Sequence, residues 1–574
     1  MSTAVHVTHE AVRQSGGIGT VLRGLLTSRA YAAHFGRNIL LGPLPDPSDP
    51  RPLGPEGELL YDGGRGIGSA EAGAALGPVE ARFGVRLVYG RRRLSGDGGE
   101  ARPEVLLVDV SRPPAGLDAF KYRLYERFGL ESLRYETNWE YEQYLRMAGP
   151  GFEGVRALLG EEDAPVWVIA HEFMGLGTAF ETILSGDRRF KTAFYAHEVA
   201  TVRRIVEERP GRDLMFYNLL RRARGEGGHI EDFFGPQDGF YKHALVSRAW
   251  VCDAVLAVGD KVVEELRFLG PEFARRRIDL VYNGVSPTEI SLEEKERSKR
   301  LLREYARNLL GWEPGRIFTH VTRLVPSKGL WRDLQVLERL DPLLARRRRP
   351  ALFVVLATET GPRAPEEVEE MVRRYGWPLV HREGYPDLTG REAEFDLQVR
   401  AFNARSRRIK VLFVNQFGWS RPCCGPAMPE EMDFSDLRKG SDAEFGQSIY
   451  EPFGIAGVEP LGFGAVCVLS DVCGCLGFLK QSAGDPAGLV VGGYTRLERE
   501  LPIERILSIG AEELRRAEAA ESGRVAGALA GRLPSGRKEA GFLLKQGYAA
   551  AAAMSWERVV EDYLLPALKR AGKR

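Results

Sequence analysis

Two glutamates in the second half of the chain have a spacing that suits a phosphorylated ligand. Glu451 lies at a bend rich in proline and glycine, and Glu459 follows eight positions later. We expect a short helix to begin near Phe453, directly before Gly454, with Glu459 about two turns along. The N–H groups and the positive dipole end at the start of such a helix favour an anion beside Glu451. The alternative is a surface helix with two ordinary glutamates, and spacing alone favours it.

Two cations precede these glutamates in the chain. Arg323 and Lys328 lie five positions apart and flank a turn that directly follows an expected strand at residues 317–321. At this spacing a guanidinium and an ammonium can clamp a diphosphate, the arginine through two hydrogen bonds and the lysine as a point charge. The alternative is a solvated loop with two ordinary cations.

A glycine-rich turn near the N-terminus contains Gly16, Gly17 and Gly19. It separates a short apolar run at residues 5–8 from a helical pattern at residues 21–31. Glycines let the backbone approach a ligand closely, and the start of the helix offers N–H groups to an anion. The spacing differs from the dinucleotide fingerprint Gly-x-Gly-x-x-Gly, so a tight packing turn is the alternative.

Two expected strands run directly into a histidine followed by a glutamate. Residues 166–170 lead into His171, and residues 192–196 lead into His197. In open α/β sheets ligands bind beyond the carboxyl ends of the strands, so the pair indicates a site. A structural role is the alternative for each histidine alone. The separation of the two and the absence of a His-Glu-x-x-His pattern argue against zinc.

The elements that position these side chains alternate between strands and helices in both halves of the chain. A charged helix at residues 291–310 separates the halves, and the alternation predicts an α/β protein with two parallel sheets covered on both faces. Residues 42–103 are rich in glycine, proline and arginine and predict an insertion composed largely of loops.

The composition limits the possible functions. A chain of 574 residues fits two or three domains, and 80 basic against 79 acidic residues give a net charge of +1. This balance does not favour a nucleic-acid partner. No apolar run reaches the roughly 18 residues of a membrane span, and the N-terminus lacks the layout of a signal peptide, so we expect a cytoplasmic protein. The six cysteines are sparse, and their spacings do not favour zinc.

Taken together, the motifs resemble the retaining glycosyltransferases of the GT-B fold. The resemblance rests on Gly16 to Gly19, Asn283 with Gly284, Arg323 to Gly329, and Glu451 to Glu459. Two further motifs resemble those of the glycogen and starch synthases. One begins at His171, and the other consists of His197 with Arg203 six positions later. The resemblance implies two Rossmann-like domains facing a central cleft. It implies an acceptor-side domain at residues 1–290, a nucleotide-sugar-binding domain at 291–545, and a C-terminal helix at 546–574 that crosses back to the first domain.

The resemblance also implies a role for each residue. Arg323 and Lys328 neutralise the donor diphosphate as the glycosidic bond breaks, which is electrostatic stabilisation of a leaving group. Glu451 holds the hydroxyls of the donor sugar near the anomeric carbon, Glu459 binds the ribose, and His197 stabilises an oxocarbenium-like transition state. The remaining residues of the donor site are Gly16, Gly17, Gly19, Phe453 and Gly454, and the further candidates for the cleft are His171, Arg203 and Asn283.

The activity implied is retaining transfer of glucose from UDP- or ADP-glucose to the non-reducing end of an α-1,4-glucan. Front-face attack is favoured over a covalent intermediate on Glu451. No strict Asp-x-Asp motif is present, so neither a metal nor another cofactor is expected; a homo-oligomer is possible. The alternatives are a transferase that makes a disaccharide or a surface polysaccharide, a nucleotide-sugar epimerase, and a non-catalytic carbohydrate-binding homologue.

The chain departs from the synthase pattern at two positions. Gln14 replaces a lysine or arginine, and Pro460 follows the second glutamate where an ordinary helix former is usual. Residues 42–103 and 360–445 do not correspond to the family, and we expect them to influence the choice of acceptor.

Overall fold

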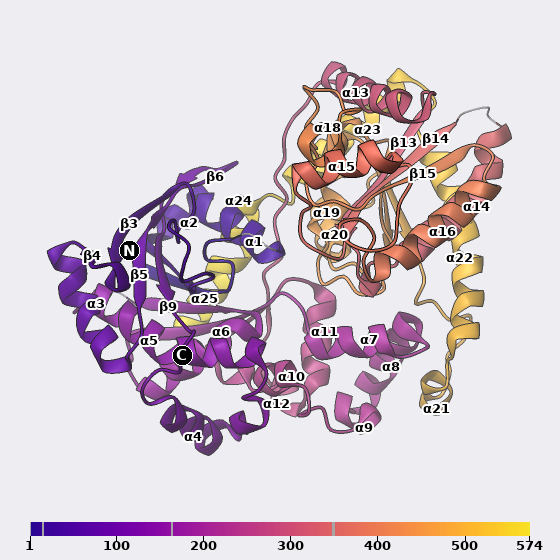
Figure 1. Cartoon of the computed structure of the whole chain (residues 1–574). Coiled ribbons are helices and arrows are strands. Elements are labelled where there is room, and N and C mark those ends of the chain that lie inside the picture. Colours follow the sequence, from indigo (N-terminus) through magenta and orange to yellow (C-terminus); the bar gives the residue numbers. More distant parts are fainter. Residues whose placement is uncertain (1, 14–15, 162–164, 347–349, 574) are drawn as a thin grey trace. The chain divides into compact units, whose positions relative to one another are not determined.

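The computed structural model describes residues 2–13, 16–161, 165–346 and 350–573. The chain folds into two compact units (Figure 1). The first contains Met1–Val202, Arg224–Gly284 and Trp556–Arg574, and the second contains Arg203–Ala223 and Val285–Ser555. Each unit has its own sheet, so the prediction of two α/β halves with parallel sheets is confirmed.

The sheet of the first unit has ten strands, of which the seven from β12 to β8 are mutually parallel. The other three strands, β5, β3 and β4, extend one edge in antiparallel fashion. In spatial order the strands are β12 (Asp279–Leu280), β11 (Ala254–Ala257), β10 (Phe190–Ala196), β9 (Val166–His171), β1 (Ser2–Val7), β2 (Phe35–Pro43), β8 (Glu104–Val108), β5 (Leu87–Arg92), β3 (Gly57–Asp62) and β4 (Ile67–Gly68).

Helices accompany this sheet along the chain. They are α1 (Gly17–Thr27), α2 (Arg29–His34), α3 (Ala70–Phe83), α4 (Leu117–Phe128), α5 (Trp139–Leu159), α6 (Glu172–Ser185), α9 (Ile230–Phe234), α10 (Tyr241–Val246), α11 (Asp260–Leu269), α12 (Pro271–Arg275), α24 (Trp556–Arg558) and α25 (Leu565–Gly572). Two more, α7 (Ala200–Glu208) and α8 (Arg212–Glu226), are divided between the units.

The expectation that residues 42–103 are mostly loop is wrong. This stretch contains β3, β5 and the helix α3, which begins after Ser69 and ends at Gly84. The Ser69 side chain accepts a hydrogen bond from the backbone N–H of Ala72, and Gly84 adopts the left-handed conformation that ends many helices. Alanine and glutamate within the stretch favour a helix strongly enough to offset its glycines.

The sheet of the second unit has six strands, all parallel. Neighbouring residues of β13 and β14 point to opposite faces, so Phe318 and Phe353 belong to one buried cluster while Ile317 and Leu352 belong to another. In spatial order the strands are β15 (Ile409–Val414), β14 (Ala351–Thr358), β13 (Arg316–Arg323), β16 (Ala443–Gly446), β17 (Val466–Ser470) and β18 (Leu489–Gly492).

The helices of the second unit cover both faces of this sheet, and α14 lies along α22 on one of them (Figure 1). Arg332 of α14 is fully buried and pairs with Glu518 of α22 and with Asp213 of α8, each at 2.8 Å. The helices are α13 (Leu292–Leu310), α14 (Leu330–Arg346), α15 (Pro365–Tyr375), α16 (Arg391–Arg405), α17 (Arg421–Cys424), α18 (Phe434–Gly440), α19 (Ile455–Val458), α20 (Cys475–Ala483), α21 (Ile503–Leu507), α22 (Ala511–Arg532) and α23 (Arg537–Ala552).

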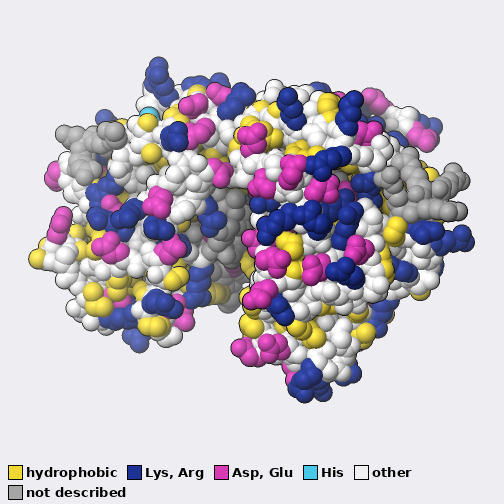
Figure 2. Space-filling view, turned by 90° about the horizontal axis from the view of Figure 1, so that it is seen from above, with side chains coloured by type: hydrophobic (Ala, Val, Ile, Leu, Met, Phe, Trp, Pro, Cys, Tyr) yellow, Lys and Arg dark blue, Asp and Glu magenta, His cyan; other side chains and the backbone are white. Residues whose placement is uncertain are grey.

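The face shown in Figure 2 carries both basic and acidic side chains. In the part of the chain that the structure describes, every helix is too short or too polar to span a bilayer.

Candidate functional site

An ion pair between Lys328 and Glu451 joins two of the predicted site residues in the second unit. The Lys328 ammonium lies 2.5 Å from Oε2 of Glu451, and the Ser448 hydroxyl donates to the same oxygen at 3.2 Å. Both charged side chains are mostly buried, with exposed fractions of 18% and 15%. A cation and an acid held together in this way can bind a phosphate and a sugar hydroxyl, respectively.

Backbone contacts fix the two loops that carry this pair. Lys328 ends a 3-10 turn after β13, and the N–H of Ile449 donates to the carbonyl of Ser327 at 2.8 Å. Gly329 has a φ of +63°, and a Cβ there would lie 2.3 Å from the carbonyl oxygen of Gln447. The close approach of the two loops therefore requires glycine at this position.

Arg323 is the last residue of β13 and precedes the turn that ends at Lys328. Its side chain is exposed, and no described residue forms an ion pair with it. Arg203 also lies in the second unit, where it is 3.6 Å from Glu207. Glu207 in turn accepts a hydrogen bond from the N–H of Ser327 at 3.2 Å, directly beside Lys328. Arg323 and Lys328 are the two predicted cations of the second unit, and a polyanion can bind to both.

The helix that we expect to begin near Phe453 is shorter than predicted. α19 spans only Ile455–Val458, and a 3-10 turn takes over at Glu459. Pro460 has no N–H and cannot continue the α-helical hydrogen bonds, which explains the change. A helix of four residues has little dipole, so it adds little to the attraction for an anion beside Glu451, and the anion site there stays a prediction.

The remaining predicted donor residues surround this short helix. Phe453 is buried, and Gly454 has a φ of +88° and abuts Glu451, whose Cγ would lie 2.8 Å from an added Cβ. Glu459 is partly exposed and lies 3.4 Å from the buried guanidinium of Arg438. Its carboxylate is therefore oriented by a cation that the sequence analysis did not identify.

In the first unit, the glycine turn already binds a carboxylate from the chain itself. Oε2 of Glu10 accepts hydrogen bonds from the N–H groups of Gly16 and Gly19, both at 3.0 Å. Glu10 is buried, whereas Gly17 is exposed at the first position of α1. Gln14, the departure from the synthase pattern, lies outside the described residues. The N–H groups at the start of α1 thus bind the Glu10 carboxylate, and their binding of a ligand anion stays a prediction.

Three histidines form a continuous chain across the carboxyl ends of three neighbouring strands. Nδ1 of His6 (β1) lies 2.9 Å from Nε2 of His171 (β9), and Nδ1 of His171 lies 2.9 Å from Nε2 of His197, which follows β10. The Tyr31 hydroxyl, from α2, lies 2.7 Å from Nε2 of His6. Burial lowers the pKa of His6 and of His197 to about 3 and that of His171 well below its ordinary value. All three rings are therefore neutral at physiological pH.

Glu172 holds the backbone beside His197. Its Oε1 accepts hydrogen bonds from the N–H groups of His197 and of Glu198, the latter at 2.7 Å. Glu172 has a φ of +58°, a strained conformation for a residue with a Cβ, and its buried Oε2 has no hydrogen-bond partner in the part of the chain that the structure describes. Burial, together with the charge of Glu198, raises the pKa of Glu172 to about 8, so this carboxyl is protonated at neutral pH.

The last predicted cleft residue and the cysteines add no further reactive group. Asn283 follows β12 and is buried, and within the described ranges its Oδ1 has no hydrogen-bond partner. All six cysteines are free, and among the described residues no three histidine, cysteine or acidic side chains are arranged to hold a metal ion.

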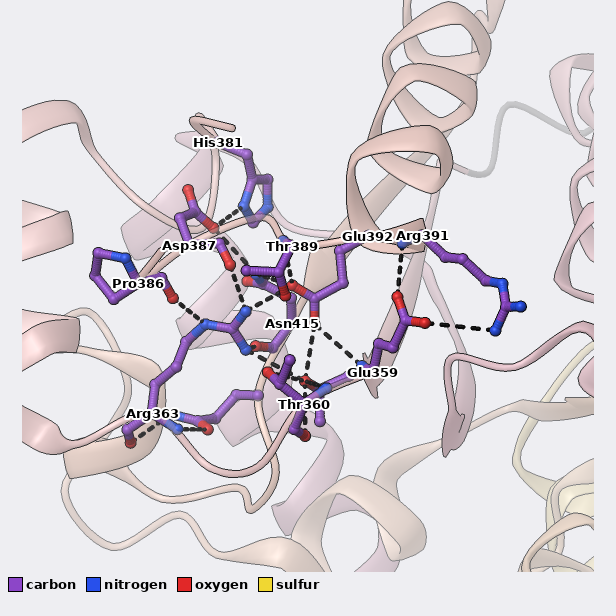
Figure 3. A network of polar contacts seen from close by, with 12 residues as sticks. Glu359, Thr360, Arg363, His381, Pro386, Asp387, Thr389, Arg391, Glu392 and Asn415 are labelled. Carbon is purple, nitrogen blue, oxygen red and sulfur yellow. Dashed lines mark hydrogen bonds and ion pairs between the residues drawn. The ribbon is translucent and has the colours of Figure 1, made fainter. Parts of the chain in front are cut away.

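A second buried network lies at the carboxyl ends of β14 and β15 and is centred on Arg363 (Figure 3). Arg363 pairs with Glu392 at 2.6 Å and donates to the carbonyls of Pro386, Asp387 and Asn415. Glu392 also accepts from the Thr358 hydroxyl at 2.8 Å and from the N–H groups of Glu359 and Thr389. Each nitrogen of the guanidinium and each carboxylate oxygen of Glu392 has a partner, so this network braces residues 358–392.

Comparisons with known proteins identify the fold. No family model matches the sequence, and no curated protein sequence matches it. A solved structure described as trehalose-6-phosphate from E. coli bound with UDP-2-fluoro glucose matches with a TM-score of 0.52 at 11% identity, over 100% of this chain and 99% of that one. The catalytic domain of starch synthase IV from Arabidopsis thaliana, bound to ADP and acarbose, matches with a TM-score of 0.50 at 13% identity, over 100% and 99% of the two chains.

A third match is a UDP-forming α,α-trehalose-phosphate synthase from Burkholderia xenovorans in complex with glucose-6-phosphate. Its TM-score is 0.51 at 12% identity, and all of both chains is covered. The chain has the GT-B fold. The resemblance drawn from the motifs is thus confirmed for the fold, and the GT-B chain presents its predicted site residues in two sets, one on each unit.

Proposed function

We propose that the protein is a retaining glycosyltransferase that uses a nucleotide-sugar donor. The observation that carries this proposal is the buried pair of Lys328 and Glu451 at the carboxyl edge of the second sheet. In a GT-B protein, a cation and an acid at this edge match the chemistry of a sugar diphosphate, which offers anionic oxygens and hydroxyls to the two groups.

In this proposal Lys328 exchanges partners when the donor binds. In the structure its charge is neutralised by Glu451 at 2.5 Å. A diphosphate carries more negative charge than one carboxylate, so it attracts the ammonium and frees Glu451 to accept hydrogen bonds from the sugar. Arg323, exposed and without an ion-pair partner among the described residues, adds a second positive charge to the diphosphate. Stabilising the charge that builds on the departing nucleotide is then the main catalytic effect.

For the acceptor we propose an α-glucan and for the donor sugar glucose, carried by UDP or ADP, as in the synthases that the motifs resemble. The alternative is a small saccharide acceptor that yields a disaccharide or its phosphate. It is favoured by the solved structures of trehalose-phosphate synthases that match the full length of the chain, one of them in complex with glucose-6-phosphate.

A screen of donors against acceptors tests the proposal. We expect nucleotide release from UDP-glucose or ADP-glucose when glycogen, a maltooligosaccharide or glucose-6-phosphate is present, together with a new α-linkage detected by NMR. Release with glucose-6-phosphate alone would favour the small acceptor. If no donor is consumed with any acceptor, the protein is not a transferase of this kind. Release of a free epimerised sugar without an acceptor would instead indicate an epimerase.

A further inference from the structure

We propose that Tyr31 fixes the tautomer of His197, so that Nδ1 of His197 carries a hydrogen and donates it to an oxygen of a bound saccharide. Tyr31 acts through His6 and His171 and is a positioning residue. The tautomer follows from the hydrogen-bond chain in the first unit, whereas its use at a saccharide rests on the proposed function.

The chain must have a direction because each ring is neutral. A neutral imidazole carries one N–H and one accepting nitrogen, so a ring that accepts on one side must donate on the other. The contacts run from the Tyr31 hydroxyl to His6 at 2.7 Å, from His6 to His171 at 2.9 Å and from His171 to His197 at 2.9 Å. Fixing the donor at one end therefore fixes every hydrogen along the chain.

Tyr31 fixes that end. Its side chain has an exposed fraction of 0%, and in the part of the chain that the structure describes Nε2 of His6 is the sole hydrogen-bond partner of its hydroxyl. If His6 donated to Tyr31, the hydroxyl hydrogen would be buried without an acceptor. An unsatisfied buried donor disfavours the reversed chain by roughly 5- to 150-fold. The Tyr31 O–H therefore donates to His6.

The hydrogens of the three rings follow from this direction. His6 accepts at Nε2 and donates from Nδ1 to Nε2 of His171. His171 then donates from Nδ1 to Nε2 of His197, which leaves the hydrogen of His197 on Nδ1. Because both nitrogens of His197 are thereby committed, the ring is a hydrogen-bond donor and not a general base.

The free end of the chain is available to a ligand. His197 is partly exposed, it follows the carboxyl end of β10, and among the described residues no group bonds to its Nδ1. Glu172 fixes the backbone of His197, so the direction of the Nδ1–H bond is fixed as well. A neutral donor of this kind suits a sugar hydroxyl or ring oxygen, because it provides a hydrogen bond without adding a charge.

Nitrogen-15 NMR of the whole protein, labelled in its nine histidines, tests the tautomer directly. We expect His6, His171 and His197 all to show the hydrogen on Nδ1 at pH 7, with signals assigned by comparison with His6→Gln, His171→Gln and His197→Gln. A His197 that carries its hydrogen on Nε2, or that is charged, overturns the proposal. This measurement needs neither substrate nor turnover.

The variant Tyr31→Phe tests the role of the hydroxyl. Without it the chain has no fixed direction, so we expect a mixture of Nδ1–H and Nε2–H forms at His197. Transfer to the best acceptor should lose about tenfold in kcat/KM, the value of one hydrogen bond. Tyr195→Phe is the matched control, because that hydroxyl is equally buried and its ring lies against His171 and His197 of the same chain, but it donates to the carbonyl of Val281. We expect Tyr195→Phe to keep the wild-type tautomer and to lose less than twofold in kcat/KM.

The two readouts separate this inference from the proposed function. An unchanged tautomer in Tyr31→Phe overturns the role of Tyr31 whatever the activity. A tautomer that changes as expected in a protein that transfers no sugar supports the chain and contradicts the proposed function. A changed tautomer with unchanged kcat/KM overturns the use of His197 as a donor to the saccharide.

Discussion

The histidine chain of the first unit and the Arg363 network of the second are both buried polar networks at the carboxyl ends of parallel strands, but they end differently. The chain from Tyr31 ends at Nδ1 of His197, a nitrogen of a partly exposed ring to which none of the described residues bonds. The Arg363 network closes on itself, since every guanidinium nitrogen and both oxygens of Glu392 have partners (Figure 3). A closed network stabilises the fold, whereas an open one retains a group that a ligand can use.

Breaking the closed network has the largest expected effect. Arg363→Met removes the charge that neutralises Glu392 and leaves a buried carboxylate unpaired, so we expect the free energy of unfolding to fall by about 3–5 kcal/mol. Denaturation with urea measures this change. Arg391→Met is the control, because Arg391 is exposed and pairs with Glu359 at only 3.4 Å, and it should cost less than about 1 kcal/mol. Equal losses in the two variants would mean that the network does not brace the unit.

Lys328→Ala tests the donor site, and its main expected effect is on catalysis. Loss of the cation that faces the diphosphate is expected to lower kcat by about 10²- to 10³-fold, as for other preorganised groups that stabilise developing charge. Nucleotide release from the donor measures it, and Lys480→Ala, which removes an exposed lysine of α20, is the control. A Lys328→Ala enzyme that turns over at the wild-type rate would refute the assignment of the donor site.

Glu172→Gln tests whether the carboxyl beside the open chain is protonated. Folding raises the pKa of Glu172 to about 8, so its contribution to stability is complete below the unfolded value of about 4.3 and is lost as the pH rises through 8. We expect the wild type to lose a few kcal/mol between pH 5 and pH 9, and Glu172→Gln, which cannot ionise, to lose less. Urea denaturation at pH 5, 7 and 9 checks this.

Glu198→Gln sharpens the same prediction. Removing the neighbouring charge that helps to raise the pKa of Glu172 should reduce the loss of stability at high pH without abolishing it. Identical pH profiles for the wild type, Glu172→Gln and Glu198→Gln would show that Glu172 is ionised throughout.

The smallest effect is expected for Arg323→Ala. The guanidinium is exposed, so its attraction for a diphosphate is screened by salt, and we expect about a tenfold rise in KM for the donor with kcat little changed. The rise should shrink as the salt concentration increases. Arg300→Ala, an exposed arginine of α13, is the control. A fall in kcat as large as that of Lys328→Ala would place Arg323 at the reacting bond instead.

The sequence predicts the parts of this molecule that local patterns specify. Strands of continuous apolar residues give the two sheets, and His171 and His197 lie at the strand ends where the pattern places them. The motif residues Lys328 and Glu451, separated by more than a hundred positions, are in contact.

The features that the sequence does not reveal depend on contacts between distant residues. Tyr31 and His6 meet across 25 positions, and His6 meets His171 across 165, so no local pattern relates them. Glu10 precedes the glycine turn, but its carboxylate reaches Gly16 and Gly19 only because the chain folds back over six to nine residues. The shortening of α19 has a local cause, Pro460. The proline is visible in the sequence, but the sequence does not fix its position within the helix.

An anion that binds at the start of α1 must first displace the carboxylate of Glu10. Two N–H groups and the helix dipole are already satisfied by one negative charge. A monovalent anion that displaced Glu10 would exchange one such charge for another and gain nothing, whereas a diphosphate would replace it with a larger charge and a net gain. We therefore expect the turn to favour a multivalent anion over a monovalent one.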